Sequence, residues 1–147
     1  MKRVKGFTLV ELMIAVVVVS ILAAIALPAY SNYVKRGKIS EATANLGSLR
    51  VSMEQYYQDN RTYQNASGNC GVTMPTSPAV KYFQFQCATA SANAYTITAT
   101  GLASGGMSGF AYTIDQDNSK KTTSLPADWN LPAGGVNCWA TKSGGSC

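Results

Sequence analysis

A single carboxylate inside an apolar run is the group in this sequence best placed to do chemistry. Glu11 is the only charged residue between Phe7 and Leu27. A carboxylate in the apolar part of a membrane is unfavourable by about 2.5–3.5 kcal/mol, so Glu11 needs a partner of opposite charge. If the chain were cut after Gly6, the new α-amine of Phe7 would lie four residues before Glu11. The spacing therefore predicts that Glu11 pairs with an N-terminal amine.

The element that must position Glu11 is a long apolar helix. Phe7–Leu27 contains 21 residues, which as a helix would measure about 31 Å and so match a bilayer core of about 30 Å. Lys2, Arg3 and Lys5 precede this run and Pro28 follows it. We expect residues 7–34 to form a helix that spans a membrane.

The motif at the start of this helix resembles the signal of type IV prepilins. Residues 6–14 read Gly-Phe-Thr-Leu-Val-Glu-Leu-Met-Ile, behind a basic leader. The resemblance implies that a prepilin peptidase removes residues 1–6, that Phe7 is then N-methylated, and that Glu11 recruits each subunit by pairing with a neighbour's amine. It also implies a precursor in the inner membrane that an assembly machinery transfers, with other pilin subunits, into an extracellular pilus.

Two other interpretations of the same segment are weaker. Lys2, Arg3 and Lys5 could begin an ordinary secretory signal that ends at Ala24-Ile25-Ala26, or the run could be a plain membrane anchor. The apolar stretch is longer than the core of a usual secretory signal. A carboxylate near its start helps neither alternative, and the prepilin interpretation is therefore preferred.

Composition limits what the rest of the chain can do. The chain has 147 residues, and the part that follows the anchor is long enough for one globular domain. The formal net charge of +5 includes three leader residues, so nine basic residues face seven acidic ones without them, a net charge of +2. A net charge this small does not indicate a nucleic-acid-binding protein. The sequence has no His and shows no catalytic pair. We predict no enzyme, no cofactor and no metal site.

The four cysteines predict two disulfides, because an even number in an exported chain is typical of an oxidising compartment. None lies in a C-x-x-C pair, which argues against redox catalysis and zinc. Sequence alone allows three pairings. Cys70–Cys87 with Cys138–Cys147 is the favoured one, and each closed loop would stabilise the fold by about 3 kcal/mol.

A second helical segment follows the anchor. Its apolar residues are spaced alternately three and four apart and form a narrow stripe, which comprises Ile39, Ala42, Leu46, Leu49, Met53 and Tyr56. We predict an amphipathic helix over residues 35–60, continuous with the anchor from Phe7 to about Asn60. Pro28 and Gly37 should weaken or kink this helix without necessarily ending it.

The remainder predicts an antiparallel sheet. A loop over 61–81 precedes segments rich in β-branched and aromatic residues, at residues 82–88, 95–100, 110–115 and 120–124. The fold class is therefore α+β: the type IV pilin fold, with a long N-terminal helix on a C-terminal sheet of about four strands. Residues 35–147 would be the globular head, with the sheet and a disulfide-closed tail in 82–147.

The tail resembles that of PilE-type minor pilins and of pilins that act as DNA-uptake receptors. The similarity covers residues 110–147, including Trp129, Trp139 and the final Gly-Gly-Ser-Cys147. It implies a minor pilin that serves in assembly, adhesion or twitching motility. The alternatives are a pseudopilin of a type II secretion system and a DNA receptor. For the receptor, Lys120, Lys121 and Lys142 would meet phosphates beside Trp139, although a solvated surface and packing tryptophans are the simpler interpretations.

Overall fold

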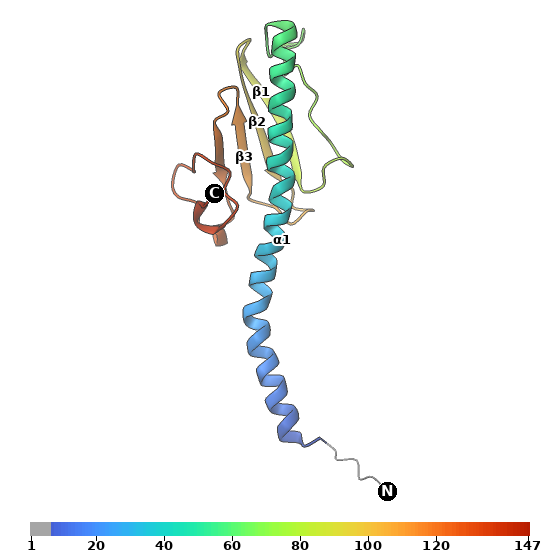
Figure 1. Ribbon diagram of the computed structural model, residues 1–147, viewed down its shortest axis with the longest axis vertical. Coiled ribbons are helices and arrows are strands. Elements are labelled where there is room, and N and C mark those ends of the chain that lie inside the picture. Colours follow the sequence, from blue (N-terminus) through green and yellow to red (C-terminus); the bar gives the residue numbers. More distant parts are fainter. Residues whose placement is uncertain (1–6) are drawn as a thin grey trace. The chain divides into compact units, whose positions relative to one another are not determined.

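The computed structural model describes residues 7–147, apart from the side chain of Ala90. These residues form one α-helix, four strands and two short 3-10 helices, Ala127–Trp129 and Ser143–Gly145. Figure 1 shows their arrangement. Helix α1 spans Leu9–Asn60. The chain divides into two compact units between Lys35 and Arg36. The leader residues Lys2, Arg3, Lys5 and Gly6 lie outside the described residues.

The first unit contains the apolar part of α1. By length and composition this helix can cross a membrane, and its most apolar stretch has a mean hydropathy of 2.8 and no buried residue. The helix begins at Leu9, two residues after the predicted start, because Thr8 caps it. The Oγ1 atom of Thr8 accepts the backbone N–H of Glu11 at 3.2 Å. Pro28 lies inside the helix and does not end it.

The second unit contains the sheet. Its strands are β1 (Phe83–Ser91), β2 (Ala94–Gly101), β3 (Ala111–Asp115) and β4 (Lys120–Ser124). They pair antiparallel in the order β1-β2-β3-β4, which confirms the predicted sheet. Strand β1 runs three residues beyond the predicted Ala88, because it pairs with β2 as far as Ser91 and the two strands are joined by only Ala92 and Asn93.

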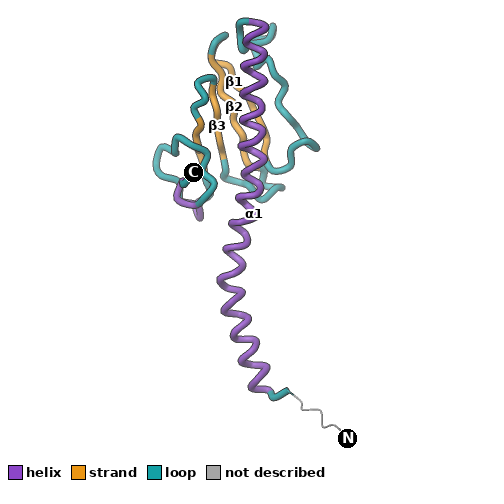
Figure 2. Tube along the Cα trace, in the orientation of Figure 1, coloured by secondary structure: helices purple, strands orange, loops and turns teal. Residues whose placement is uncertain are grey.

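The core of the second unit lies between α1 and one face of the sheet. The predicted helical stripe is buried at Ile39, Ala42, Leu46, Leu49 and Met53, whereas Tyr56 is half-buried. Alternate residues on each strand face it, as the period of two requires, and these are Phe83, Phe85, Tyr95, Ile97, Ala99, Tyr112 and Ile114. Figure 2 shows α1 crossing in front of the strands, with the loops at either side.

The tail completes the same core beyond β4. Thr122 is fully buried, and its hydroxyl donates to the carbonyl of Cys138 at 2.6 Å and accepts the N–H of Ala140 at 2.8 Å. The hydroxyl of Tyr112 donates to the carbonyl of Ala140 at 3.0 Å. Because Thr122 pairs with Tyr112 in the register, the tail covers the sheet face that α1 covers elsewhere.

Disulfides close the loop before β1 and the end of the chain. Cys70 is bonded to Cys87, 17 residues apart, and Cys138 to Cys147, 9 residues apart. These are the two pairs that the sequence favoured. The first holds the 61–81 loop against β1, and the second closes a loop that contains the 3-10 turn Ser143–Gly145.

Candidate functional site

Glu11 lies in the first turn of α1, three residues after the capping Thr8. The positive end of a helix dipole favours a carboxylate at this position, and Thr8-x-x-Glu11 is the sequence pattern of a capping box. Glu11 is exposed in the single chain, as is Phe7 at 82%. The local fold therefore presents the carboxylate outward, four residues from the predicted mature N-terminus.

The helix around Glu11 presents apolar side chains on all sides. Its exposed large residues include Leu9, Val10, Leu12, Met13, Ile14, Val16, Val17, Val18, Val19, Ile21, Leu22, Ile25 and Leu27. A shallow groove of about 280 Å³ lies among Leu12, Ala15, Val16, Val19 and Ser20. Ser20 donates its hydroxyl to the carbonyl of Val16 at 2.7 Å and so leaves no free donor there. Such a surface suits lipid chains or other helices.

Two charged residues of α1 hold the sheet against the helix, and sequence reasoning missed both. The Glu41 carboxylate accepts the backbone N–H groups of Lys81, Tyr82 and Phe83 at 3.0, 2.8 and 3.1 Å. One turn earlier, Nζ of Lys38 donates to the carbonyl of Gly105 at 2.8 Å and lies 5.0 Å from the centre of the Tyr82 ring. The only feature of the sequence that could have indicated these contacts is the position of the two charged residues next to the apolar stripe.

The three lysines proposed for DNA contact do not share one face of the sheet. Lys120 and Lys121 are exposed neighbours on β4, and neighbouring strand residues point to opposite faces. Lys120 places Nζ 4.9 Å from the centre of the Trp139 ring. Lys142 is exposed in the loop closed by Cys138 and Cys147. The structure therefore brings together Lys120 and Trp139 and separates Lys121 from them.

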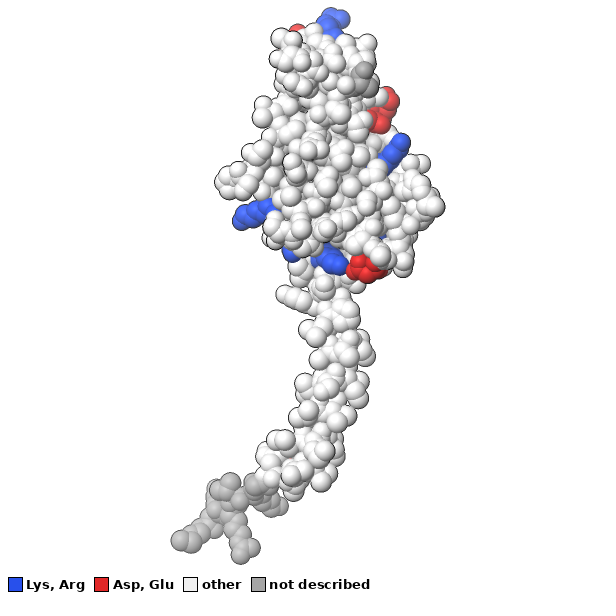
Figure 3. Space-filling model, turned by 180° about the vertical axis from the view of Figure 1, so that it is seen from behind, with Lys and Arg blue, Asp and Glu red and all other residues white. Residues whose placement is uncertain are grey.

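Neither tryptophan is free to stack on a base. Trp129 is 1% exposed and packs edge-on against Phe110, with 4.9 Å between ring centres. Trp139 is half-buried, donates Nε1–H to the carbonyl of Thr113 at 2.9 Å, and has Lys120 over its ring. Both residues pack the tail onto the core. Lys and Arg side chains are scattered, not clustered, on the side of the head seen in Figure 3.

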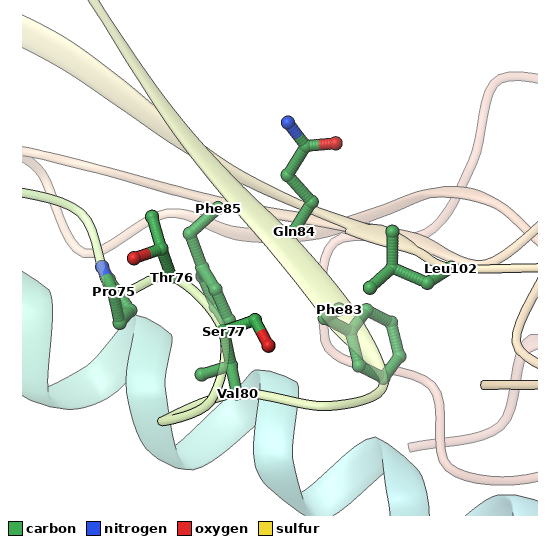
Figure 4. A pocket seen from close by; sticks show the side chains of 8 residues that line it. All are labelled: Pro75, Thr76, Ser77, Val80, Phe83, Gln84, Phe85 and Leu102. Carbon is green, nitrogen blue, oxygen red and sulfur yellow. The ribbon is translucent and has the colours of Figure 1, made fainter. Parts of the chain in front are cut away.

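A second hollow lies beside the start of β1, where the preceding loop returns to the sheet (Figure 4). Its volume is about 280 Å³, and its lining is Pro75, Thr76, Ser77, Val80, Phe83, Gln84, Phe85 and Leu102. Gln84 projects away from the other labelled side chains. The lining contains two hydroxyl side chains, those of Thr76 and Ser77, and no charged group.

The strongest pKa shifts belong to buried tyrosines. Burial raises the pKa of Tyr63 to about 12, helped by its hydrogen bond to Glu54. Burial also raises the pKa of Tyr95 and of Tyr112. These hydroxyls stay neutral at ordinary pH. Within residues 7–147 no group of three or more His, Cys, Asp or Glu side chains could hold a metal ion.

Comparison with protein families identifies the class and then the family. Residues 1–27 match the family described as the prokaryotic N-terminal methylation motif. Residues 28–111, more than half of the chain, match the family described as type IV minor pilin ComP, DNA uptake sequence receptor. The chain is thus a type IV pilin and belongs to the ComP family.

Individual relatives agree with this assignment. The chain is 38% identical over 101 residues to the fimbrial protein EcpC of Eikenella corrodens. The aligned region covers 69% of this chain and 65% of EcpC. It is 41% identical over 73 residues to the type IV major pilin PilE1 of Neisseria gonorrhoeae, and this alignment covers 50% of this chain and 44% of PilE1. The alignments thus span less than two thirds of these relatives.

A solved structure supports the fold. The non-core minor pilin PilV of Neisseria meningitidis superposes with a TM-score of 0.50 at 16% identity, over 65% of this chain and 92% of PilV. At this identity the similarity concerns the fold alone. It agrees with the predicted type IV pilin fold.

Proposed function

We propose that this chain is a structural subunit of a type IV pilus and not an enzyme. The observation that carries the proposal is a helix with an exposed apolar surface and a single carboxylate, Glu11, in its first turn. Residues 1–6 are the leader, residues 7–34 the membrane and filament-core helix, and residues 35–147 the head. The precursor resides in the inner membrane, where prepilin peptidase cuts between Gly6 and Phe7 and Phe7 is N-methylated.

Assembly follows from the surface of the helix. Lipid chains and a bundle of apolar helices are similarly apolar, so transfer between them yields little hydrophobic free energy. Packing of the apolar side chains and the pairing of Glu11 with a neighbouring subunit's N-terminal amine drive the step instead. The pair neutralises both charges inside an apolar environment, where an unpaired carboxylate is unfavourable. Other pilin subunits and an inner-membrane machinery are the partners.

The position of the mature N-terminus tests this processing. Intact-mass spectrometry of chain purified from membranes or filaments should find a protein that starts at Phe7 and carries one extra methyl group. The names of the relatives, fimbrial proteins and major pilins, favour a pilus over a secretion pseudopilus. A mature chain that starts at Leu27, after Ala24-Ile25-Ala26, would instead establish an ordinary secretory signal.

A second candidate function is DNA reception during uptake, favoured by the family match over residues 28–111. The distribution of basic residues limits the strength of DNA binding, since Lys121 points away from Lys120 and Trp139. Two or three phosphate contacts would give weak binding with a log–log salt slope of about −2 to −3. A role in uptake would be compatible with the structural role, because a minor subunit can occupy the same filament.

Fluorescence anisotropy of labelled duplex DNA with the full chain in detergent tests this candidate. Binding at low salt that is lost when Lys120, Lys121 and Lys142 are all changed to Ala would support a receptor. Replacement of Lys35, Arg36 and Lys81 by Ala serves as the charge-matched control. Absence of binding, or equal binding by both triple variants, would leave the structural role alone.

A further inference from the structure

Two Asn-x-Ser/Thr triplets lie at the end of α1 and in the loop that follows it, and pilus assembly uses neither of them. They are Asn60-Arg61-Thr62 and Asn65-Ala66-Ser67. In an exported chain this pattern is the acceptor of N-linked glycans, but such triplets also arise by chance. A transferase must reach both the Asn amide and the Ser or Thr hydroxyl. The structure differs between the two triplets on this point.

The second triplet lies at the tip of a short hairpin. Gln64 and Cys70 pair as an isolated antiparallel bridge, and all five residues between them, 65–69, are exposed. The N–H of Gly68 donates to the carbonyl of Asn65 at 2.9 Å and closes the turn. Gly68 has a φ of +78°, a conformation that glycine adopts readily. Because the disulfide from Cys70 ties the hairpin to β1, the tip is exposed and also held in place.

The side chains of this tip leave the amide nitrogen and the hydroxyl available. Oδ1 of Asn65 accepts the N–H groups of Ser67 and Asn69 at 2.9 and 3.1 Å, whereas its Nδ2 has one contact, 3.5 Å from the carbonyl of Cys70, which is longer than usual. The hydroxyl of Ser67 forms no hydrogen bond with any residue from 7 to 147. Turn formation explains Asn65, because Asn side chains bond the backbone two residues on. It does not explain the hydroxyl of Ser67.

The first triplet has its reactive groups engaged within the chain. Nδ2 of Asn60 donates to the carbonyl of Tyr56 at 2.9 Å, in the last turn of α1. The hydroxyl of Thr62 donates to the carbonyl of Ala92 at 3.3 Å and accepts the N–H of Gln64 at 3.0 Å, and Thr62 is half-buried. A transferase would have to break these bonds to reach either group. The first triplet is therefore an internal control for the second.

We propose that Asn65 is an acceptor of an N-linked glycan and that Asn60 is not. The donor is an oligosaccharide carried on a polyprenyl diphosphate in the membrane, so the proposal rests on the proposed export of the head. Nδ2 of Asn65 attacks C1 of the first sugar, and the bond from C1 to the diphosphate oxygen breaks. One amide proton passes to a base of the transferase, and the polyprenyl diphosphate leaves. The transferase binds the hydroxyl of Ser67 while it holds the amide.

Peptide mapping by mass spectrometry, on reduced chain purified from the organism that makes it, tests the proposal. Trypsin cuts after Arg61 and Lys81, so the two candidate sites fall on different peptides, 51–61 and 62–81. Peptide 62–81 should carry a saccharide mass and peptide 51–61 should not. The saccharide should be lost completely in Asn65→Gln and retained in the control Asn60→Gln. An unmodified peptide 62–81, or a saccharide on Asn60, would overturn the proposal.

Substitutions of Ser67 distinguish an N-linked from an O-linked glycan. Ser67→Thr keeps the hydroxyl and should keep the saccharide, whereas Ser67→Ala should lose it. A saccharide that survives Asn65→Gln would be attached to a hydroxyl and would contradict the proposal. Ser67→Ala also serves if Asn65→Gln does not fold, since the hydroxyl of Ser67 has no hydrogen bond within the described chain. The intact mass reports the N-terminus as well. A chain that starts at Phe7 without a saccharide would overturn this site and leave the pilin function standing.

Discussion

Residues 9–35 and residues 36–60 belong to the same helix, α1, but they differ in what surrounds their side chains. In the first segment apolar residues lie on every side of the helix as far as Ala29, and the described residues contain no buried side chain before Ile39. In the second, the apolar residues form one stripe, and five of them are buried against the sheet. The apolar surface of the first segment is exposed in the single chain and suits lipid or other helices, whereas the second segment packs against the sheet of its own chain.

This comparison shows that a side-chain pattern determines the partner of a helix and not only its existence. A narrow apolar stripe on a helix can be buried by one face of a sheet. A helix that is apolar all round needs partners on all sides. The predictions that follow separate the two segments by perturbing one while leaving the other intact.

Alkaline pH should have the largest effect and should act on the head alone. A tyrosine normally titrates near pH 10, whereas burial raises the pKa of Tyr63 to about 12 and also raises those of Tyr95 and Tyr112. Because the folded-state pKa values exceed the unfolded ones, the stability contributed by the neutral hydroxyls is present below pH 10. It is lost as the pH rises from about 10 toward 12.

Circular dichroism and tyrosinate absorbance of the full chain in detergent measure this effect. Tyrosinate absorbance from the buried residues should appear together with loss of the sheet. Helical signal from residues 9–29 should remain, since Glu11 is the only titratable side chain there. Titration of all tyrosines near pH 10 with the sheet intact would contradict the burial described here.

Truncation of the stripe should have the next largest effect. Leu46 is fully buried, and Leu46→Ala should lower the free energy of unfolding of the head by about 2–5 kcal/mol. Val51 lies on the same segment of α1 but is 52% exposed, so Val51→Ala should change it by less than about 0.5 kcal/mol. Chemical denaturation of both variants in detergent compares them. Equal effects would mean that the stripe does not face the core.

Loss of the Glu41 carboxylate should have the smallest effect of the three. Glu41→Gln replaces one of the acceptor oxygens that bind the N–H groups of Lys81, Tyr82 and Phe83. It should lower the free energy of unfolding by about 1–2 kcal/mol. Asp59→Asn, at an exposed position near the end of α1, removes the same charge and should be near neutral. If both variants behave alike, Glu41 does not hold β1 against the helix.

The sequence predicted the elements but not the contacts that lock them together. The spacing of Ile39, Ala42, Leu46, Leu49 and Met53 was enough to predict the buried stripe, because periodicity is a local property. The bonds from Glu41 to residues 81–83 span about 40 residues and depend on how the chain folds back. The same holds for Thr122, whose burial follows from the path of the tail and not from its strand.

The candidate site shows the same difference between local patterns, which the sequence predicts, and long-range contacts, which it does not. The motif around Gly6, Phe7 and Glu11 is contiguous, so the sequence alone identifies it. The grouping of Lys120, Lys121 and Lys142 was a spatial hypothesis. Strand alternation separates Lys121 from Lys120, and Lys120 instead contacts the ring of Trp139.

The central claim is that Glu11 acts in assembly and not in folding or membrane insertion. The most direct measurement is the amount of filament formed by Glu11→Val, with the amount of chain in the membrane determined in parallel. Met13→Val, an apolar exchange in the same exposed part of α1, is the control and should assemble normally. We predict that Glu11→Val accumulates in the membrane, because removing a charge favours insertion, and forms few or no filaments. Filaments at the wild-type level would contradict the role assigned to Glu11.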